Sequence, residues 1–134
     1  MRTVFADTFY FLALLNPSDH AHGKAVDFTT SNDVRMVTTA WVMTELADGL
    51  AMSDRGRTEF LATLADLQTD PDATIIPCEP VLMAEGIQLY GQRLDKQWSL
   101  TDCISFAAMT RLGVTEALTA DHHFEQAGFI ALLK

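Results

Sequence analysis

The chain has 134 residues, enough for one domain with a real hydrophobic core and too few for two ordinary ones, so we expect a single domain over residues 1–134. Hydrophobic residues make up 49% and charged residues 20%, a balance typical of a globular protein and not of a disordered or fibrous one. Nine basic and eighteen acidic residues give a formal net charge of −9, which argues against a broad electropositive groove for nucleic acid but allows a substrate that is bridged through a metal ion.

The sequence gives no sign of a membrane span or of a secretory signal. No stretch approaches about 18 uninterrupted apolar residues, and the first residues lack a basic region followed by a small-residue cleavage site. We therefore expect a cytoplasmic protein with no membrane anchor. The two cysteines, Cys78 and Cys103, are expected to be reduced, buried thiols.

Short β-rich runs alternate with longer segments of helical periodicity, a pattern typical of β–α–β units around a mainly parallel sheet. The first half of the chain predicts, in order, a strand at 2–6, a helix at 8–15, a turn at Asn16-Pro17, a helix over about 19–30, a strand within 32–39 and a helix within 40–53.

The second half continues the alternation. It predicts a helix at 55–68 after Ser53-Asp54, a strand at Ile75-Ile76, a long helix over about 79–96, a helix within 99–112 that Gly113 ends, a strand within 116–121, a helical turn at 122–128 and a strand at 129–133.

Two aspartates follow predicted strands. Asp7 comes directly after the first strand and Asp121 closes the fourth, so parallel strands would bring both carboxylates to one edge of the sheet. Ligands of open α/β sheets bind beyond that edge. Taken alone, each aspartate also fits the N-cap of the helix that follows it.

A third acid, Glu45, lies one to two turns into the helix after the second strand, near the same edge. The helical wheel places it on the inward, apolar side, where solvated glutamates are uncommon. A capping box does not explain it, because an N-cap at Thr38 or Thr39 would need the acid at Trp41 or Val42.

The fourth acid, Asp102, has two compatible roles. The sequence "SLTD" places it three residues after Ser99, a fair match to a capping box. The helical wheel also aligns it with Phe106 and Met109, on the buried stripe of its helix.

Acids that converge in a partly apolar cleft repel one another, and a divalent cation resolves this conflict. Oxygen ligands without paired Cys or His spacing favour Mg²⁺ or Mn²⁺ over zinc. Such ions commonly bridge to substrate phosphates, so the acids predict metal-assisted hydrolysis of phosphodiester bonds.

Four stretches of the chain resemble, in order and spacing, the acidic blocks of PIN-domain ribonucleases, particularly the VapC-like toxins of prokaryotic toxin–antitoxin pairs. They are "VFADTFYFLALL", "TTAWVMTELADGL", "WSLTDCISFAAM" and "ALTADHHFEQAGF". The resemblance covers almost the whole chain. Any single block is weak, because an aspartate after a strand is common, but four blocks in order are fairly specific.

The resemblance implies an α/β/α sandwich with a mainly parallel five-stranded sheet. It also implies Mg²⁺- or Mn²⁺-dependent cleavage of RNA that leaves 5′-phosphate and 3′-hydroxyl ends, a protein antitoxin that covers the site, and a homodimer. The residues that match the metal-binding and catalytic quartet are Asp7, Glu45, Asp102 and Asp121. Thr8 and Thr119 match hydroxyl positions that support the site in the family. Ser99 and Thr101 begin the helix that carries Asp102.

The sequence departs from the family pattern at His122-His123, where variable polar residues are usual, and at Phe9-Tyr10, which are bulkier than the usual residues. The two histidines could tune protons near the site, but adjacent side chains point in different directions along a helix, which disfavours a catalytic role and leaves their contribution open. Two other functions stay open: a catalytically inactive PIN-like binding module, and an aspartate-dependent phosphohydrolase. The second is disfavoured because Thr8-Phe9, and not a DxD-type continuation, follows Asp7.

Overall fold

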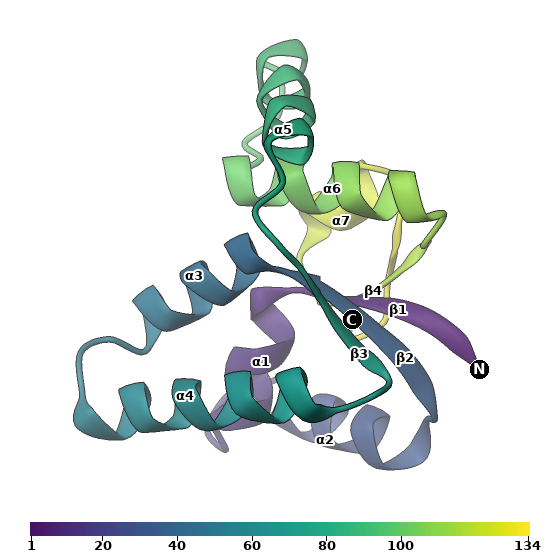
Figure 1. The fold of residues 1–134 in the computed structure, drawn as a ribbon. Helices are drawn as coiled ribbons and strands as arrows, with labels where there is room; N and C mark the ends of the chain where they lie inside the picture. Colours follow the sequence, from purple (N-terminus) through teal and green to yellow (C-terminus); the bar gives the residue numbers. More distant parts are fainter.

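The structure of the chain is a computed structural model that describes all of residues 1–134. Its centre is a sheet of five strands in the order β3-β2-β1-β4-β5, and every pair of neighbouring strands is parallel (Figure 1). The strands are β1 (Arg2–Ala6), β2 (Val34–Thr39), β3 (Ala73–Ile76), β4 (Glu116–Leu118) and β5 (Ile130–Ala131).

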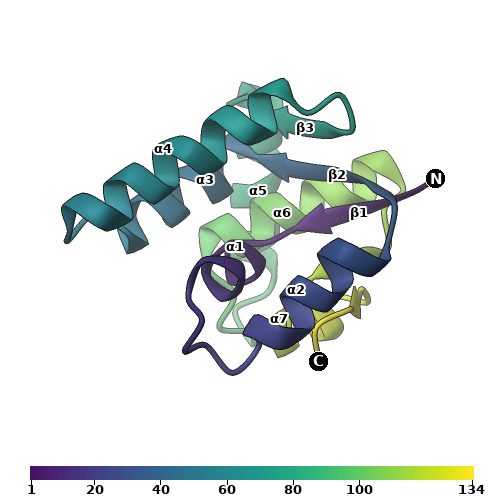
Figure 2. The ribbon, with the colours of Figure 1, turned by 90° about the horizontal axis from the view of Figure 1, so that it is seen from below.

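Helices cover both faces of the sheet. They are α1 (Thr8–Leu15), α2 (His22–Ser31), α3 (Ala40–Gly49), α4 (Asp54–Thr69), α5 (Pro80–Gln92), α6 (Leu100–Leu112) and α7 (His122–Gln126). In Figures 1 and 2, α1, α2 and α4 lie on one side of the sheet, and α5, α6 and α7 lie on the other. The expected α/β/α sandwich with a five-stranded parallel sheet is confirmed. None of the helices combines the length and the apolar character that crossing a bilayer requires.

Most predicted elements are confirmed, and their errors lie at the ends. The helix predicted from about residue 19 begins at His22, because the Asp19 carboxylate accepts a hydrogen bond from the Ala21 N–H and holds residues 19–21 in a turn. The long helix predicted to about residue 96 ends at Gln92, and the helix predicted within 40–53 ends at Gly49. The last two strands are shorter than predicted, with three and two residues.

The core lies between the sheet and both helical layers. Val4, Phe5 and Ala6 of the central strand β1 are fully buried, as expected for a parallel strand that is covered on both faces. Both cysteines are unpaired as predicted, and Cys103 is buried. The prediction that Cys78 is buried was wrong: it is exposed, since it lies in the connection between β3 and α5.

Two glycines are required by the fold. A Cβ atom at Gly86 in α5 would lie 2.3 Å from Ile104 Cγ1 in α6, so the close approach of these two helices depends on a residue without a side chain. Gly113 ends α6 as predicted, with φ of 67° in the left-handed region that favours glycine.

The topology fixes where a ligand can bind. Strands β1, β2 and β4 are adjacent and parallel, so the segments that follow them all leave the sheet at its carboxyl edge. Ala6 of β1 pairs in register with Leu118 of β4, and Asp7 and Thr119 are the next residues of each chain segment. The register therefore brings side chains 112 residues apart into contact.

Candidate functional site

The predicted acids meet in one cavity at the carboxyl edge of the sheet. The cavity has a volume of about 420 Å³ and only two large apolar side chains in its wall, Phe9 and Leu12. The residues that line it are Asp7, Thr8, Phe9, Leu12, Glu45, Gly49, Gln97, Ser99, Asp102, Asp121 and His123. A larger hollow of about 640 Å³ beside α1 and α4 contains none of the four predicted acids, so the candidate site is the smaller, acidic cavity.

Asp7 is the most buried of these acids, with 5% of its surface exposed. It stands at the N-cap position of α1, but its side chain makes no capping hydrogen bond. Instead, its Oδ2 atom accepts a hydrogen bond of 3.0 Å from the Thr119 hydroxyl. Helix capping, the competing interpretation of this aspartate, therefore does not account for its carboxylate.

Burial raises the pKa of Asp7 from 3.8 to about 7. The hydrogen bond from Thr119 acts against this shift, while the nearby charges of Asp102 and Glu45 add to it. Burial of a carboxylate beside two others costs free energy that a bound cation would recover.

Glu45 lies on α3 and faces the cavity, as its place on the helical wheel predicted. The N-cap of α3 is Thr39, whose hydroxyl accepts a hydrogen bond from the Val42 N–H, so Glu45 has no part in capping. Its Oε1 atom accepts a hydrogen bond from the Thr8 hydroxyl, and this contact orients the carboxylate.

Asp102 combines both roles that the sequence allowed. Its backbone N–H donates to Ser99 Oγ at 3.0 Å, and its Oδ2 atom accepts from the Ser99 N–H at 3.2 Å, which completes the predicted capping box of α6. Neither hydrogen bond uses Oδ1. Burial raises the pKa of Asp102, the Ser99 N–H lowers it, and the charge of Asp121 raises it.

The last acid, Asp121, is the N-cap of α7, and its Oδ1 atom accepts a hydrogen bond of 2.9 Å from the His123 N–H. Its own N–H donates to the Thr119 hydroxyl at 3.1 Å. Thr119 thus connects two of the acids, since the same hydroxyl donates to Asp7. Asp121 also keeps an unbonded carboxylate oxygen, Oδ2.

Of the four predicted supporting residues, three touch the acids: Thr8, Ser99 and Thr119. The fourth, Thr101, precedes Asp102 on α6, and its hydroxyl makes no hydrogen bond with the acids, so its supporting role stays a prediction.

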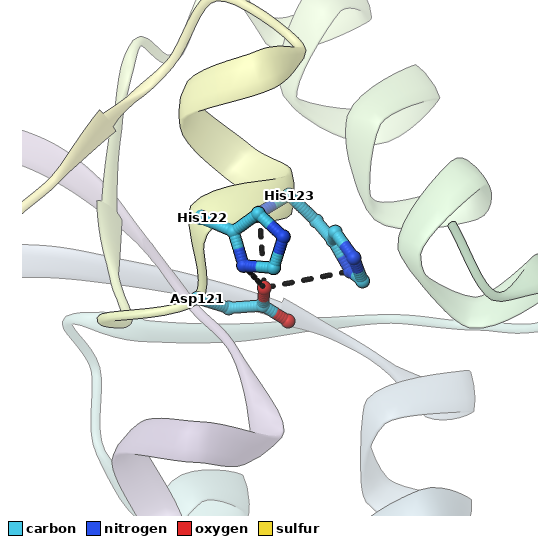
Figure 3. A group of neighbouring side chains, drawn as sticks. All are labelled: Asp121, His122 and His123. Atoms are coloured by element: carbon cyan, nitrogen blue, oxygen red, sulfur yellow. Dashed lines mark hydrogen bonds and ion pairs between the residues drawn. The ribbon is translucent and has the colours of Figure 1, made fainter. Parts of the chain in front are cut away.

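His123 is the residue that sequence reasoning undervalued. Its ring lines the cavity and its Nδ1 atom lies 3.3 Å from Asp102 Oδ2 and 3.4 Å from Asp121 Oδ1. The expectation that His122 and His123 point in different directions was wrong, because both rings turn toward Asp121 (Figure 3). The departure from the family pattern at these positions was the signal that could have found them.

The donor atoms fit a divalent cation. Four carboxylates reach one cavity and one of them, Asp7, is nearly fully buried, while Glu45, Asp102 and Asp121 each keep an oxygen that accepts no hydrogen bond. Such clusters of carboxylate oxygens bind divalent metal ions and are strongly unfavourable without them.

No protein-family model matches the chain. It is 27% identical over 130 residues to the 23S rRNA-specific endonuclease VapC20 of Mycobacterium tuberculosis, in the sequences of two strains, and the match covers 95% of each protein.

Several solved structures have a fold similar to that of this chain. The crystal structure of Mycobacterium tuberculosis VapC20, described as a Sarcin-Ricin loop cleaving toxin, matches with a TM-score of 0.85 and 24% identity over 95% of this chain and 96% of that one. FitAcB from Neisseria gonorrhoeae matches with a TM-score of 0.67 and 20% identity, over 98% and 95% of the two chains. A structure of FitAB bound to an IR36 DNA fragment matches with a TM-score of 0.69 and 18% identity, over 100% of this chain and 96% of that one. The predicted resemblance to VapC-like PIN proteins is confirmed.

Proposed function

We propose that this chain, which shares sequence and fold with the VapC20 endonuclease, is a metal-dependent ribonuclease that hydrolyses RNA phosphodiester bonds and acts as the toxin of a toxin–antitoxin pair. The observation that carries the proposal is the cavity that Asp7, Glu45, Asp102 and Asp121 share at the carboxyl edge of the sheet. VapC20 is itself named as an endonuclease of 23S rRNA, and the match extends over nearly the whole of both proteins.

In this proposal, Asp7, Asp102 and Asp121 hold the cation, and Glu45 either binds it or orients the attacking water. Mg²⁺ or Mn²⁺ suits these oxygen ligands, and when bound it supplies a Lewis acid that makes water more nucleophilic and stabilises charge on the phosphate and the leaving oxygen. The Thr8 hydroxyl holds Glu45, and the Thr119 hydroxyl holds Asp7, so the acids are oriented before substrate arrives.

The charge of the chain explains why the cation matters for RNA binding. Six of the nine basic side chains lie in ion pairs with acids outside the cavity, among them Arg2 with Glu116 and Arg93 with Asp95. RNA therefore meets few free cations near the cavity, and neutralisation of the acids has to come from the bound metal ion.

The partners follow from the same resemblance. We infer a protein antitoxin that covers the acidic cavity, RNA products with 5′-phosphate and 3′-hydroxyl ends, and a cytoplasmic site of action, where the RNA substrates are.

A homodimer is also proposed. Four apolar side chains on α5 and just after it are about half-exposed or more, namely Val81, Ile87, Tyr90 and Leu94. Exposed apolar side chains gathered on one segment are typical of an interface. Light scattering on the purified chain tests the dimer, and a monomer at micromolar concentration would contradict it.

The test of the function is cleavage of a panel of structured and unstructured RNAs with Mn²⁺, followed by sequencing of the new 5′ ends. We expect cleavage by the wild-type chain and a loss of at least about a hundredfold in Asp7→Asn, since this variant removes a ligand from the reacting site. Asp48→Asn is the matched control, because Asp48 is an exposed aspartate on α3 that lies outside the cavity.

The alternative function, a catalytically inactive binding module, predicts a different result. If neither the wild-type chain nor the Asp48→Asn control cleaves any RNA with Mg²⁺ or Mn²⁺, the ribonuclease proposal fails.

A further inference from the structure

Two adjacent histidines turn toward one carboxylate oxygen at the end of the acidic cavity. The Nδ1 atoms of His122 and His123 lie 3.6 Å and 3.4 Å from Asp121 Oδ1, and the two rings are 4.4 Å apart. Figure 3 shows both rings at the N-terminal end of α7, with their contacts meeting at this oxygen. The three side chains each offer one donor atom within 4.8 Å of the others.

The two distances from Asp121 Oδ1 are compatible with three ligands around one cation. An N–H···O hydrogen bond normally has a donor–acceptor distance of about 2.7–3.2 Å, and both of these distances are longer. With metal–ligand bonds of about 2.1 Å, neighbouring ligand atoms lie about 3.0 Å apart in an octahedral site and about 3.4 Å apart in a tetrahedral one. The observed distances of 3.4 and 3.6 Å lie at and just above the larger of these values, so the proposal on the metal depends on the donor atoms and not on a coordination geometry.

The three residues Asp121, His122 and His123 lie at the cavity that the four acids share. His123 is 20% exposed, lines the cavity and also lies 3.3 Å from Asp102 Oδ2, so one imidazole stands between two carboxylates. His122 is 66% exposed and stands at the rim. The N-cap hydrogen bond from the His123 N–H holds Asp121 Oδ1 in place near both rings.

We propose that Asp121, His122 and His123 form a mixed oxygen–nitrogen cation site, so that this end of the cavity prefers first-row transition metals such as Mn²⁺, Co²⁺ and Ni²⁺ to Mg²⁺. Imidazole nitrogen binds these ions well, whereas Mg²⁺ prefers oxygen ligands and water. The inference rests on the proposed function only in placing the nuclease at the same cavity. It changes the expectation from the sequence, which considered oxygen ligands alone.

The competing explanation is that the histidines only form ion pairs or hydrogen bonds with Asp121 and Asp102. Pulsed electron paramagnetic resonance of the wild-type chain with one equivalent of Mn²⁺ separates the two, because a directly bound imidazole couples its nitrogen nucleus to the metal. We expect this nitrogen coupling in the wild-type chain and its loss in the double variant His122→Gln/His123→Gln. No nitrogen coupling in the wild-type chain overturns the proposal, and this measurement needs no variant to fold.

Calorimetry tests the metal preference. In the double variant we expect the affinity for Ni²⁺ to fall at least about tenfold, while the affinity for Mg²⁺ changes less than about twofold. An equal change for both metals, or none for Ni²⁺, contradicts a nitrogen-containing site. His20→Gln is the control, since His20 is an exposed histidine in the loop between α1 and α2.

Failure of this inference and failure of the proposed function are distinguishable. The spectroscopic and calorimetric measurements contain no RNA, so a chain that binds Ni²⁺ through its histidines but cleaves nothing refutes only the ribonuclease. A chain that cleaves RNA with Mn²⁺ and shows no nitrogen coupling refutes only the role of the histidines.

Discussion

The Thr119 hydroxyl donates a hydrogen bond of 3.0 Å to Asp7 Oδ2, and the same hydroxyl accepts one of 3.1 Å from the Asp121 N–H. These contacts connect the acid after β1 with the acid after the neighbouring strand β4. Because Thr119 is fully buried, its hydroxyl cannot exchange these partners for water. Thr119 therefore holds two of the proposed ligands at a fixed distance.

We expect Thr119→Val to weaken cation binding as well as the fold. The variant leaves Asp7 Oδ2 buried without its donor, which costs about 1–3 kcal/mol of stability. Thr38→Val is the control, because the Thr38 hydroxyl is equally buried but donates to the Ala6 carbonyl and not to an acid. Calorimetric titration with Mn²⁺ should show a loss of affinity only in Thr119→Val; equal affinities in the two variants would contradict a positioning role.

The metal-free chain should lose stability as the pH rises from about 4 to about 7. The folded Asp7 carboxyl has a pKa of about 7, against 3.8 for an unperturbed aspartate. Between these values the folded state holds a proton that the unfolded state has released, so the free energy of unfolding falls as pH increases. Asp102 contributes in the same direction, because burial also raises its pKa.

Urea denaturation of the chelator-treated chain at several pH values measures this effect. Asp7→Asn should lose less stability than the wild-type chain between pH 4 and pH 7, and should be the more stable of the two at pH 8. Asp48→Asn should follow the wild-type profile, since Asp48 is exposed. Parallel profiles for all three proteins would show that Asp7 does not titrate in this range.

A bound divalent cation should restore the free energy of unfolding that the metal-free chain loses as the pH rises. A ligand that binds only the folded state at 100 times its Kd stabilises it by about 2.7 kcal/mol. We expect Mn²⁺ at pH 7.5 to raise the melting temperature of the wild-type chain by several degrees, and a chelator to remove the gain. In Asp7→Asn the increase should be much smaller, whereas an undiminished increase would place the cation away from this cavity.

The packing of α5 on α6 depends on Gly86. A Cβ atom in Gly86→Ala would lie 2.3 Å from Ile104 Cγ1 and 3.1 Å from the Ile104 Cα atom, so the helices must separate. We expect a loss of about 1–3 kcal/mol in the free energy of unfolding, measured by urea denaturation.

Gly91→Ala, on the same helix, is the matched control. No atom lies within 4 Å of its added Cβ, and alanine favours a helix over glycine by up to about 1 kcal/mol. The two variants should therefore change stability in opposite directions. A neutral Gly86→Ala would mean that α5 can shift on α6 without cost.

Local sequence signals were sufficient for much of the secondary structure. Ser53 and Ser99 cap their helices, and Gly113 ends α6, because these residues act on backbone groups within one turn of the helix. The predicted boundaries were wrong where such signals are weak, namely at the start of α2, at the end of α5, and in the short strands β4 and β5.

The candidate site was predictable to the extent that it follows strand ends. Asp7 and Asp121 could be assigned to one edge from the parallel alternation alone, and Glu45 from its place on the apolar side of a helix. Which oxygen of Asp102 belongs to the capping box, and which is left for a ligand, depends on side-chain geometry that no spacing rule gives.

The sequence by itself determined the order of strands and helices, several helix caps and the choice of the four candidate acids, because these depend on interactions between residues close in the chain, on helical periodicity or on a strand-end rule. Only the tertiary structure decided that Thr119 meets Asp7 and that His122 and His123 both face Asp121. The first contact requires the register of β1 on β4, and the second requires the turn from β4 into a helix of only five residues. The backbone directions of adjacent helical residues still diverge, so it is the side-chain torsions of His122 and His123 that turn both rings toward Asp121.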